Sequence, residues 1–396
     1  MLDKTQLKIG IVGASGRGSM AQHWHDPQGR SIVTAGMDVS DEALEFFKKN
    51  VNSEAFVAKD IDEFLSKADI DAVCIMSPDF THQEYVIKAF KAGKHVFSEK
   101  PMALTTQGCD EMLEAWRLSG KKFMIGFNMR YMNIFGKMKE IADSGAIGDI
   151  KAVWVRHFVG HGGEWYYHDW HGNSKNSTGL LLQKASHDID MIHWITGQYT
   201  KKVTGFGSLD YYGGDKPDDL HCPDCDQKDD CVEYQSDKAR LGNKMDMCVF
   251  RQEVDVEDQS TIIMDLEGGI KATYMQCHYT PDYWRNYVFI GTKGRLENMD
   301  DSSKVIVKVR EQYKKKEGLE DKEYDIEIPE GSHGGADPVI CKDFVDMLLD
   351  NKKPVATPLA GRMSVAVGCA ATESIRNKNQ VMEIPALPDE LKDKVF

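Results

Sequence analysis

A glycine-rich turn near the N-terminus constrains the fold of this chain more than any other feature. The apolar run Lys8–Val12 leads into the sequence GASGRG at residues 13–18, and a segment able to form a helix, Gly18–Trp24, follows. Glycines between a strand and a helix let the backbone turn tightly and approach a pyrophosphate, which the helix N-terminus binds. The turn predicts a dinucleotide site, the alternative being a glycine-rich turn in another kind of α/β domain. Ser15 stands where the usual G-x-G-x-x-G motif has its second glycine.

Short apolar runs alternate with helical patterns over the first third of the chain. The expected strands are Lys8–Val12, Ser31–Met37, Ala72–Met76, His95–Ser98 and Lys122–Phe127, and the expected helices are Gly18–Trp24, Asp41–Lys49, Ile61–Ser66, Thr81–Ala92 and Thr105–Ser119. This alternation is typical of parallel βαβ units and predicts a doubly wound parallel sheet of the Rossmann type. Asp38 ends the second strand and could accept hydrogen bonds from a ribose, which favours NAD over NADP. Arg17 and Arg30 leave that choice open.

The composition argues against several classes of partner. The 396 residues carry a formal net charge of −14, whereas nucleic acids and anionic membranes both need a cationic surface. No run of about 18 apolar residues predicts a membrane span. The first residues lack the pattern of an export signal, so the nine cysteines are expected to be reduced thiols of a cytoplasmic protein.

Lys100 is the first candidate catalytic residue. It follows the expected strand His95–Ser98 and precedes Pro101, which cannot continue a sheet ladder. Lys100 is therefore expected at the carboxyl edge of the sheet, where ligands bind in open α/β folds.

His187 is the second candidate, and it lies in a predicted helix that begins near Gln183 and continues to Ile195. Residues three and four apart share a helix face, so Lys184, His187 and Asp188 group together, as do Gln183, His187 and Asp190. Such a cluster is costly in an apolar core and indicates a cleft. A histidine titrates near neutrality and suits a proton acceptor. His193 on the same helix is interpreted as structural.

Four segments together closely resemble the Gfo/Idh/MocA family of NAD(P)-dependent oxidoreductases. They are GIVGASGRG, MSPDFTHQEYVIKAFKAGKHVFSEKP, GFNMRYMNIFGKMKEIADSGAIGDI and QKASHDIDMIHWITG, and the similarity covers nearly the whole chain. The resemblance implies a Rossmann domain followed by a domain with a large, open, mostly antiparallel sheet. We expect a dinucleotide-binding domain at residues 1–128, a substrate and oligomerisation domain at 129–336 with an insertion at about 209–258, and C-terminal helices at 337–396 that pack back near the Rossmann domain.

The second domain contains runs that read as strands. They are Ile147–Phe158, Lys202–Leu209, Gln259–Asp265, Gly269–His278, Trp284–Gly291, Gly294–Asn298, Lys304–Arg310 and Glu323–Ile328. Gln312–Glu320, with three consecutive lysines, is expected to be a solvated turn. Two helices, Pro338–Leu349 and Met363–Asn377, are expected at the end of the chain.

The resemblance also implies roles for individual residues. His187 would accept the hydroxyl proton, and Lys100 would polarise the substrate oxygen or hold it for hydride transfer. Gln183 stands where several inositol dehydrogenases carry an aspartate, so a carboxylate relay is not expected. The cofactor is expected at Gly13, Ala14, Ser15, Gly16, Arg17, Gly18 and Asp38 from the turn and second strand and, by the resemblance, at Ser77, Pro78, His82, Glu99, Lys100 and Asn128. Asp79 stands where many relatives carry asparagine.

A stretch rich in aromatic and polar residues, His161–His171, precedes the histidine helix. Aromatic faces stack on the C–H faces of sugars, and the interleaved polar side chains can bind hydroxyls, although a packed surface loop is the alternative. Ser332–Asp337 is expected to be another substrate-side loop, or a simple helix cap by Asp337. The predicted substrate residues are Arg130, Tyr131, Trp165, His168, Lys184, Asp188, Asp190 and His333.

Cysteines gather in the expected insertion. Cys222, Cys225 and Cys231 have a spacing close to that of structural zinc ligands, and Cys248 follows, but the usual second C-x2-C pair is missing. A structural zinc on Cys222, Cys225 and Cys231 and free loop thiols are both open, and no metal is expected in catalysis. Residues 209–258 alone have a net charge of −9.

These features predict an NAD-dependent dehydrogenase that oxidises a secondary hydroxyl of a sugar, glycoside or cyclitol, with NADP a less favoured cofactor. A half-covered sheet would expose apolar surface, so a homodimer or homotetramer is expected. One alternative is a glycoside hydrolase or lyase that uses tightly bound NAD transiently, with no net redox change. The other is a non-catalytic NAD-binding regulatory module.

Overall fold

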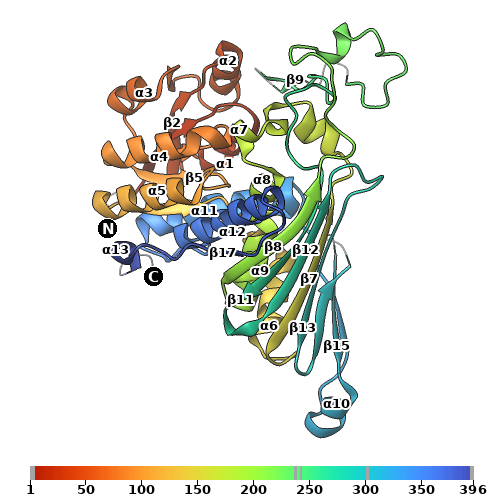
Figure 1. Cartoon of the computed structure of the whole chain (residues 1–396). Helices are drawn as coiled ribbons and strands as arrows, with labels where there is room; N and C mark the ends of the chain where they lie inside the picture. The colour runs from red at the N-terminus through yellow and green to blue at the C-terminus, as the bar shows by residue number, and fades with distance from the viewer. Residues whose placement is uncertain (1–4, 236–238, 241–242, 300–302, 393–396) are drawn as a thin grey trace.

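The computed structural model describes residues 5–235, 239–240, 243–299 and 303–392. Its N-terminal sheet is parallel, with the strand order β3-β2-β1-β4-β5-β6 (Figure 1). The strands are β1 (Leu7–Val12), β2 (Ser31–Met37), β3 (Phe56–Ala58), β4 (Ala72–Ile75), β5 (His95–Ser98) and β6 (Phe123–Ile125). The order reverses between β1 and β4, which is the switch point where doubly wound sheets bind ligands. The predicted Rossmann fold is confirmed, and β3 is an additional strand.

Several helices of this domain begin at a side chain that caps them. Ser40 accepts a hydrogen bond from the Ala43 amide at the start of α2 (Asp41–Asn50), and Asp60 does the same for Asp62 and Glu63 in α3 (Ile61–Lys67). Such caps satisfy amides that have no partner within the helix. The remaining helices of the domain are α1 (Ala21–Trp24), α4 (His82–Lys91) and α5 (Thr106–Ser119).

The second sheet is mixed and mostly antiparallel, as predicted. Its order is β16-β15-β14-β13-β7-β12-β11-β8-β17, and among its described residues only β7 and β12 pair in parallel. The strands are β7 (Ile150–Phe158), β8 (Thr200–Ser208), β11 (Gln259–Leu266), β12 (Lys271–Cys277), β13 (Trp284–Gly291), β14 (Gly294–Asn298), β15 (Lys304–Val309), β16 (Lys322–Asp325) and β17 (Met382–Glu383).

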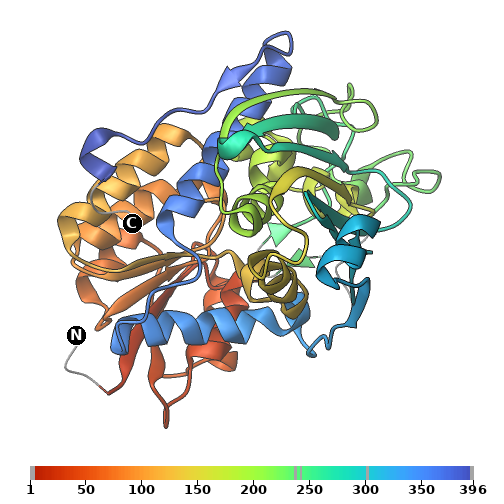
Figure 2. The ribbon, with the colours of Figure 1, turned by 90° about the horizontal axis from the view of Figure 1, so that it is seen from below.

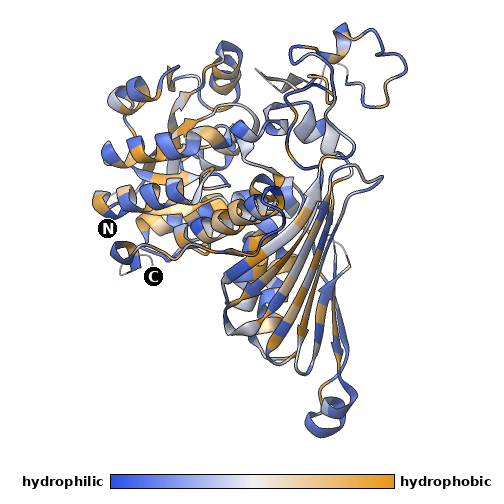
Figure 3. Ribbon diagram, in the orientation of Figure 1, coloured by the Kyte–Doolittle hydropathy of each residue, from blue (hydrophilic) through white to orange (hydrophobic). Residues whose placement is uncertain are grey.

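One face of this sheet is covered and the other is bare. α6 (Asn133–Asp143), α9 (Ser186–Thr196) and α12 (Pro358–Arg376) share a hydrophobic core with the inner face. Burial alternates along β11, as it does in a strand with one solvated face. Apolar side chains nevertheless occur on the outer face, where Phe206 is 69% exposed and Ile263 is 51% exposed. Figure 3 shows that hydrophobic and hydrophilic residues are interspersed along the strands of this sheet.

Two predictions for this region are wrong. The expected continuous helix from Gln183 is broken, because α8 (Leu180–Gln183) ends there and α9 begins only at Ser186. The amides of Lys184 and Ala185 both donate to the Leu180 carbonyl, which widens the turn between the two helices. Lys184 therefore precedes the histidine helix rather than lying on it. The expected solvated turn Gln312–Glu320 instead contains most of a short helix, α10 (Glu311–Glu317).

The end of the chain returns to the nucleotide domain. α11 (Ala336–Leu349) lies alongside the red N-terminal elements in Figure 2. Phe344 packs edge-on against Trp24 and Phe97, and the Trp24 indole donates to the Cys341 carbonyl. In α12 the fully buried Arg362 binds Asp110 and the backbone carbonyl of Pro385. A short helix, α13 (Asp389–Lys392), follows.

The acidic insertion forms loops beside α7 (Ser174–Ser177), with a two-residue pairing of β9 (Ala239–Arg240) and β10 (Asn243–Lys244). Residues 236–238 and 241–242 of this segment lie outside the described part of the chain. No helix among the described residues is long and apolar enough to cross a lipid bilayer.

Candidate active site

The glycine-rich turn has the geometry that the sequence predicts. Gly13 has a φ of +86°, and a Cβ there would lie 2.7 Å from the Ser77 amide nitrogen. A Cβ at Gly18 would lie 2.1 Å from the Gly13 carbonyl oxygen. Ser15 departs from the motif without strain, because its φ is −107° and the left-handed position falls on Gly16 instead. The turn keeps β1, the start of the next helix and the loop after β4 in close contact.

Asp38 fixes this turn. Its carboxylate accepts hydrogen bonds from the amides of Ala14 at 2.8 Å and Ser40 at 3.0 Å. The carboxylate therefore lies at the carboxyl edge of the sheet, where the ribose was expected.

Arg17 and Arg30, the two arginines that left the choice between NAD and NADP open, both bind carboxylates. Arg17 pairs with Glu99 and Asp337, each at 2.8 Å. Arg30 pairs with Asp346 and Asp350 at the far end of α11.

His82, predicted as a cofactor contact, is instead buried between two loops and links them. Its Nδ1 lies 2.7 Å from the Pro101 carbonyl oxygen and its Nε2 lies 2.9 Å from the Ser77 carbonyl oxygen. The ring is fully buried and holds the loop after β4 against the loop after β5. Because both ring nitrogens face backbone oxygens, we revise its role to positioning Ser77 and Pro78.

Two polar atoms near the strand ends lack a hydrogen-bond partner within the described part of the chain. They are Asp79 Oδ2 and Asn128 Oδ1, and both are buried. The Asn128 amide donates to Asp337. Burial raises the pKa of Asp79, partly opposed by His82, His171 and Lys100. Buried polar atoms without partners are uncommon in proteins and mark places where a polar ligand can bind.

Lys100 and His187 come together from the two domains. The Lys100 ammonium follows β5 and donates to the Gln183 carbonyl at 3.0 Å, in the turn before α9. His187 is buried in the first turn of α9, its ring edge-on to Phe127, and its Nδ1 has no partner among the described residues. Burial lowers the pKa of Lys100, an effect that Asp79 partly opposes. Burial, followed by the charges of Lys100, Arg285 and Lys184, lowers the pKa of His187 well below its ordinary value. Lys100, Lys184, His187 and Arg285 are called the basic cluster below.

Asp188, predicted to bind substrate, is fully buried beneath this cluster. Its oxygens accept hydrogen bonds from Tyr287 and Tyr274, and they lie 3.2 Å from His157 Nδ1 and 3.3 Å from Arg285 Nε. Burial alone would raise the pKa of Asp188, but Arg285 and His157 outweigh it and hold that pKa below its ordinary value. We therefore assign Asp188 to positioning Arg285.

The inner face of the second sheet supplies polar residues that the sequence reading missed. Gln276 of β12, His157 of β7 and Arg285 of β13 lie directly opposite one another in the strand register. Nε2 of Gln276, Nε2 of His157 and both ring nitrogens of His278 are buried without partners in the described chain. A polar row on the covered face of a strand breaks the expected apolar alternation, which was the available signal.

The aromatic stretch lies next to this row. Tyr166 contacts the rings of His171 and His278, and the Lys184 ammonium lies 5.7 Å from the centroid of its ring. Trp170 meets Phe80 of the nucleotide domain at 5.6 Å between ring centroids. Trp165 points outward and is 41% exposed.

His168, also predicted to bind substrate, is fully buried and structural. Its Nδ1 lies 2.6 Å from the Met247 carbonyl oxygen in the insertion. The buried Arg251 of the insertion donates to the carbonyls of Tyr167 and Asp169. The insertion therefore fixes the backbone of the aromatic stretch, and His168 belongs to that contact.

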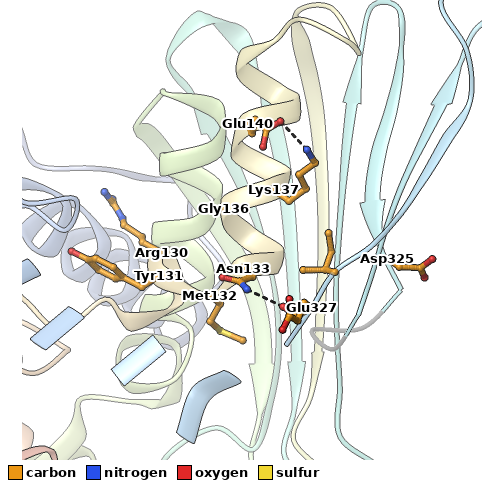
Figure 4. A pocket seen from close by; sticks show the side chains of 10 residues that line it. Arg130, Tyr131, Met132, Asn133, Gly136, Lys137, Glu140, Asp325 and Glu327 are labelled. Carbon is orange, nitrogen blue, oxygen red and sulfur yellow. Dashed lines mark hydrogen bonds and ion pairs between the residues drawn. The ribbon is translucent and has the colours of Figure 1, made fainter. Parts of the chain in front are cut away.

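Three more of the residues predicted to bind substrate lie outside the basic cluster. Arg130 and Asp190 form a buried ion pair at 2.6 Å, and the Tyr131 hydroxyl donates to Asp343 at 2.6 Å. In Figure 4 the side chains of Arg130 and Tyr131 point away from Asp325 and Glu327, with which they line a hollow of about 360 Å³. None of the basic cluster lines this hollow. The polar groups of these three residues are already satisfied by these contacts. We therefore assign them to joining the second domain to the segment around α11.

His333 lies next to Arg17 of the glycine-rich turn. Its Nδ1 is 3.1 Å from Asp337, which also binds Arg17 and Asn128. The N-cap residue of α11 is Gly335, and Asp337 lies in the first turn, where its carboxylate accepts hydrogen bonds from Arg17 and Asn128.

The described residues contain no group of three or more His, Cys, Asp or Glu side chains arranged to hold a metal ion. All nine cysteines are free thiols, and Cys225 accepts a hydrogen bond from the Gln227 amide. The expectation of a zinc site on Cys222, Cys225 and Cys231 is therefore not supported by the described residues.

Comparisons with known proteins give two family matches. Residues 7–127 match the model described as "Oxidoreductase family, NAD-binding Rossmann fold", and residues 139–384 match "Oxidoreductase family, C-terminal alpha/beta domain". The chain is 28% identical over 392 residues to YteT of Bacillus subtilis (strain 168), covering 88% of this chain and 90% of that protein. It is 30% identical over 203 residues to myo-inositol 2-dehydrogenase of Thermotoga maritima, covering 51% of this chain and 59% of the relative. The match to this dehydrogenase thus spans little more than half of its length.

Solved structures share the fold over nearly the whole chain. The scyllo-inositol dehydrogenase of Lactobacillus casei with bound NAD(H) and scyllo-inositol has a TM-score of 0.71 at 24% identity, covering 96% of this chain and 100% of that one. The WlbA dehydrogenase of Bordetella pertussis in complex with NADH and UDP-GlcNAcA has a TM-score of 0.71 at 19% identity, covering 96% and 99%.

Proposed function

Because the chain belongs to the Gfo/Idh/MocA family of oxidoreductases, we propose that it is a dehydrogenase that oxidises a secondary hydroxyl of a sugar, glycoside or cyclitol with NAD. The inositol dehydrogenases among its relatives support this substrate class. The observation that carries the proposal is the convergence of Lys100 and His187, because an alcohol oxidation needs a proton acceptor beside the cofactor.

The residues at the strand ends fit a dinucleotide. Gly13 and Gly18 leave no room for a side chain, and Asn128 Oδ1 and Asp79 Oδ2 are buried polar atoms that lack partners in the described chain. Residues 13–18, Ser77, Pro78, Glu99 and Asn128 would hold NAD. When bound, NAD supplies the hydride acceptor.

Proton transfer falls to the side chains of this chain. A neutral His187 can accept the hydroxyl proton, and the lowered pKa keeps its imidazole in the neutral form. The Lys100 ammonium stabilises the negative charge that develops on the substrate oxygen as the proton leaves. The Gln183 carbonyl orients Lys100, and the Phe127 ring orients His187.

The charges around the turn support NAD over NADP. A 2′-phosphate would meet the Asp38 carboxylate, while Arg17 and Arg30 are each bound to two carboxylates. Either arginine would have to leave its partners to bind the phosphate.

A second copy of the chain is proposed to cover the outer face of the second sheet. Phe206, Ile263, Trp154 and Ile290 are all at least 45% exposed on this sheet. Contiguous exposed apolar side chains are typical of association surfaces, which supports a homodimer or homotetramer.

The test is a cofactor-reduction screen over sugars, glycosides and cyclitols with NAD and with NADP, followed by variants. We expect Lys100→Met and His187→Asn each to lower kcat by about 100-fold or more on the best substrate, because positioned proton transfer is worth 10²–10⁴. Lys91→Met, on an exposed lysine of α4, is the control and should keep the rate. Unchanged rates in the first two variants would refute their roles. Product formation without NADH accumulation would favour the transient use of NAD.

A further inference from the structure

His278 is a fully buried histidine whose ring nitrogens serve no contact within the described part of the chain. It follows the last residue of β12, and neither ring nitrogen has a hydrogen-bond partner among the described residues. A buried polar atom without a partner costs free energy, and an imidazole has two such atoms. Because most buried polar side chains are hydrogen-bonded, a ring with two unpartnered nitrogens calls for an explanation outside the fold.

The backbone of His278, in contrast, is held at both of its polar groups. Its amide donates to the Asp258 carbonyl at 2.9 Å, and its carbonyl accepts from the Tyr212 hydroxyl at 3.0 Å. A Cβ on Gly162 of the aromatic stretch would lie 2.0 Å from the same carbonyl oxygen. The insertion and the aromatic stretch therefore fix the position of a ring whose nitrogens are left without partners.

The ring lies beside the polar row on the covered face of the second sheet. Side chains two residues apart share a face of a strand, so His278 lies next to Gln276 on that face. Gln276 is opposite His157 in the strand register, and His157 Nδ1 is 3.2 Å from Asp188, the neighbour of His187. His278 is therefore connected through the sheet to the start of α9.

The aromatic stretch gives a second connection between His278 and the reaction centre. The ring centroids of Tyr166 and His278 are 5.5 Å apart. The Lys184 ammonium lies 5.7 Å from the same Tyr166 centroid, and Lys184 directly follows the residue whose carbonyl accepts the Lys100 hydrogen bond. Two separate sets of contacts thus place His278 close to the groups that are proposed to handle the proton.

The unpartnered atoms offer donors as well as an acceptor. Burial lowers the pKa of His278 well below its ordinary value, and the neutral imidazole has one N–H and one bare nitrogen. Gln276 Nε2 is a further donor, while Oε1 of that amide already accepts from the Tyr274 hydroxyl at 3.1 Å. A carboxylate or phosphate would leave the bare nitrogen without a partner. A hydroxyl both donates and accepts, so two neighbouring hydroxyls can satisfy all three nitrogens.

We propose that His278 binds the substrate, and that together with Gln276 it holds two neighbouring hydroxyls of the ring away from the carbon that is oxidised. This inference rests on the proposed dehydrogenase function. It narrows the substrate to rings with a free vicinal diol on the side that faces the second sheet. Because the nitrogens of His278 serve the ligand rather than the fold, their removal should cost affinity and not stability.

The variants His278→Phe and His193→Phe test stability. Phenylalanine keeps an aromatic ring and removes both nitrogens. His193 is a matched control because it is also buried, but its Nε2 lies 2.8 Å from the Thr200 hydroxyl. In urea denaturation without added sugar, we expect His278→Phe to have the midpoint of the unmodified protein or a higher one, and His193→Phe to have a lower one.

Affinity is measured by titration calorimetry of the NADH-loaded protein. The probes are myo-inositol, scyllo-inositol, D-glucose, D-galactose and the methyl β-glycosides of the two sugars. For the probe that binds most tightly, we expect His278→Phe to raise the Kd by about 10- to 100-fold and Gln276→Met by about fivefold or more. His278→Gln keeps a donor and an acceptor and should raise the Kd less than His278→Phe does. The Kd of His193→Phe should stay within roughly threefold of the native value.

Several results would overturn the inference. They are a Kd in His278→Phe within roughly threefold of the native value, a His278→Phe protein that fails to fold or loses as much stability as His193→Phe, and binding of none of the six probes. If a probe binds through His278 but neither the probes nor the wider screen give NADH with NAD, the binding role stands and the dehydrogenase function fails. If a probe is oxidised and His278→Phe binds it normally, the function stands and the role of His278 fails.

Discussion

At the scale of single residues, the sequence predicts which side chains have suitable chemistry better than it predicts where those side chains lie in the fold. Lys100 and His187 were singled out by a strand end and by a helical cluster, and the structure brings them together across the two domains. Asp188 was assigned to the same face, yet it lies fully buried below His187. Helical spacing cannot tell a side chain that faces a ligand from one that faces a polar pair inside the core. That distinction depends on Arg285, which comes from a strand almost one hundred residues later.

The buried position of Asp188 leads to a prediction about stability. Asp188→Asn removes the charge that compensates Arg285, so we expect the free energy of unfolding to fall by about 3–5 kcal/mol. Urea denaturation followed by circular dichroism measures this change. Asp325→Asn, on a side chain that is 87% exposed, is the control and should change stability by less than about 1 kcal/mol. Equal stability of the two variants would contradict the role of Asp188.

At the scale of elements, the Rossmann strands could be predicted to within a few residues, because each is an apolar run next to a turn. The short strand Phe56–Ala58 and the helix Asn133–Asp143 were missed. Phe56–Ala58 is only three residues long and is defined by its pairing with β2. Asn133–Asp143, in contrast, buries Ile134, Phe135, Met138 and Ile141 at helical spacing, so its sequence contained a local signal. The break between α8 and α9 was also missed, since it depends on two amides that share the Leu180 carbonyl.

The glycine-rich turn provides a prediction at this scale. Gly13→Ala places a Cβ against the Ser77 backbone and forces an alanine to a φ of +86°. We expect the Kd for NADH to rise by about 10- to 100-fold, corresponding to strain of about 1–3 kcal/mol. Quenching of protein fluorescence by NADH measures it.

Gly120→Ala is the matched control in the same domain. Gly120 also has a positive φ, +65°, but it follows the last residue of α5 and a Cβ there meets nothing within 4 Å. The Kd for NADH should change by less than roughly threefold in this variant. An equal loss in both variants would contradict the argument from the Gly13 backbone.

At the scale of the whole molecule, the large sheet and its bare face followed from the family resemblance and not from local pattern. Strand order within the sheet, including the parallel pair β7–β12, depends on long-range pairing that spacing does not encode. The covered face could be predicted from alternation, and a polar residue that breaks this alternation is visible within each strand. That Gln276, His157 and Arg285 form one row could not be predicted, because the row depends on the pairing of three strands.

The bare face gives a prediction about assembly. Ile263→Lys together with Trp154→Lys places two charges on the exposed side of the sheet and should shift the protein from an oligomer to a monomer. Size-exclusion chromatography with light scattering measures the mass. Val232→Lys, on an exposed residue of the insertion, should leave the mass unchanged. A monomeric unmodified protein, or an oligomer that survives the double change, would contradict the use of this face.

Buried histidines make stability depend on pH. Burial lowers the pKa of His157 and of His193 to about 3, while the unfolded chain keeps values near 6.5. Between about pH 6.5 and pH 4 the unfolded state therefore binds more protons, so stability is present above pH 6.5 and is lost as pH falls. Two such groups give a slope approaching about 2.7 kcal/mol per pH unit. Urea unfolding at pH 7, 6 and 5 measures it, and equal stability across this range would contradict the burial of neutral rings.

The packing of α11 on Trp24 and Phe97 has a consequence for synthesis. The first six strands leave the ribosome early, but the side chains that close one face of their sheet belong to residues 336–349. Until these residues emerge, the nucleotide domain has an open apolar face and a turn whose Arg17 lacks Asp337. The domain that is synthesised first therefore completes its packing last. Residues 1–128 produced alone would keep this apolar face exposed, and the fragment would be prone to associate with other apolar surfaces.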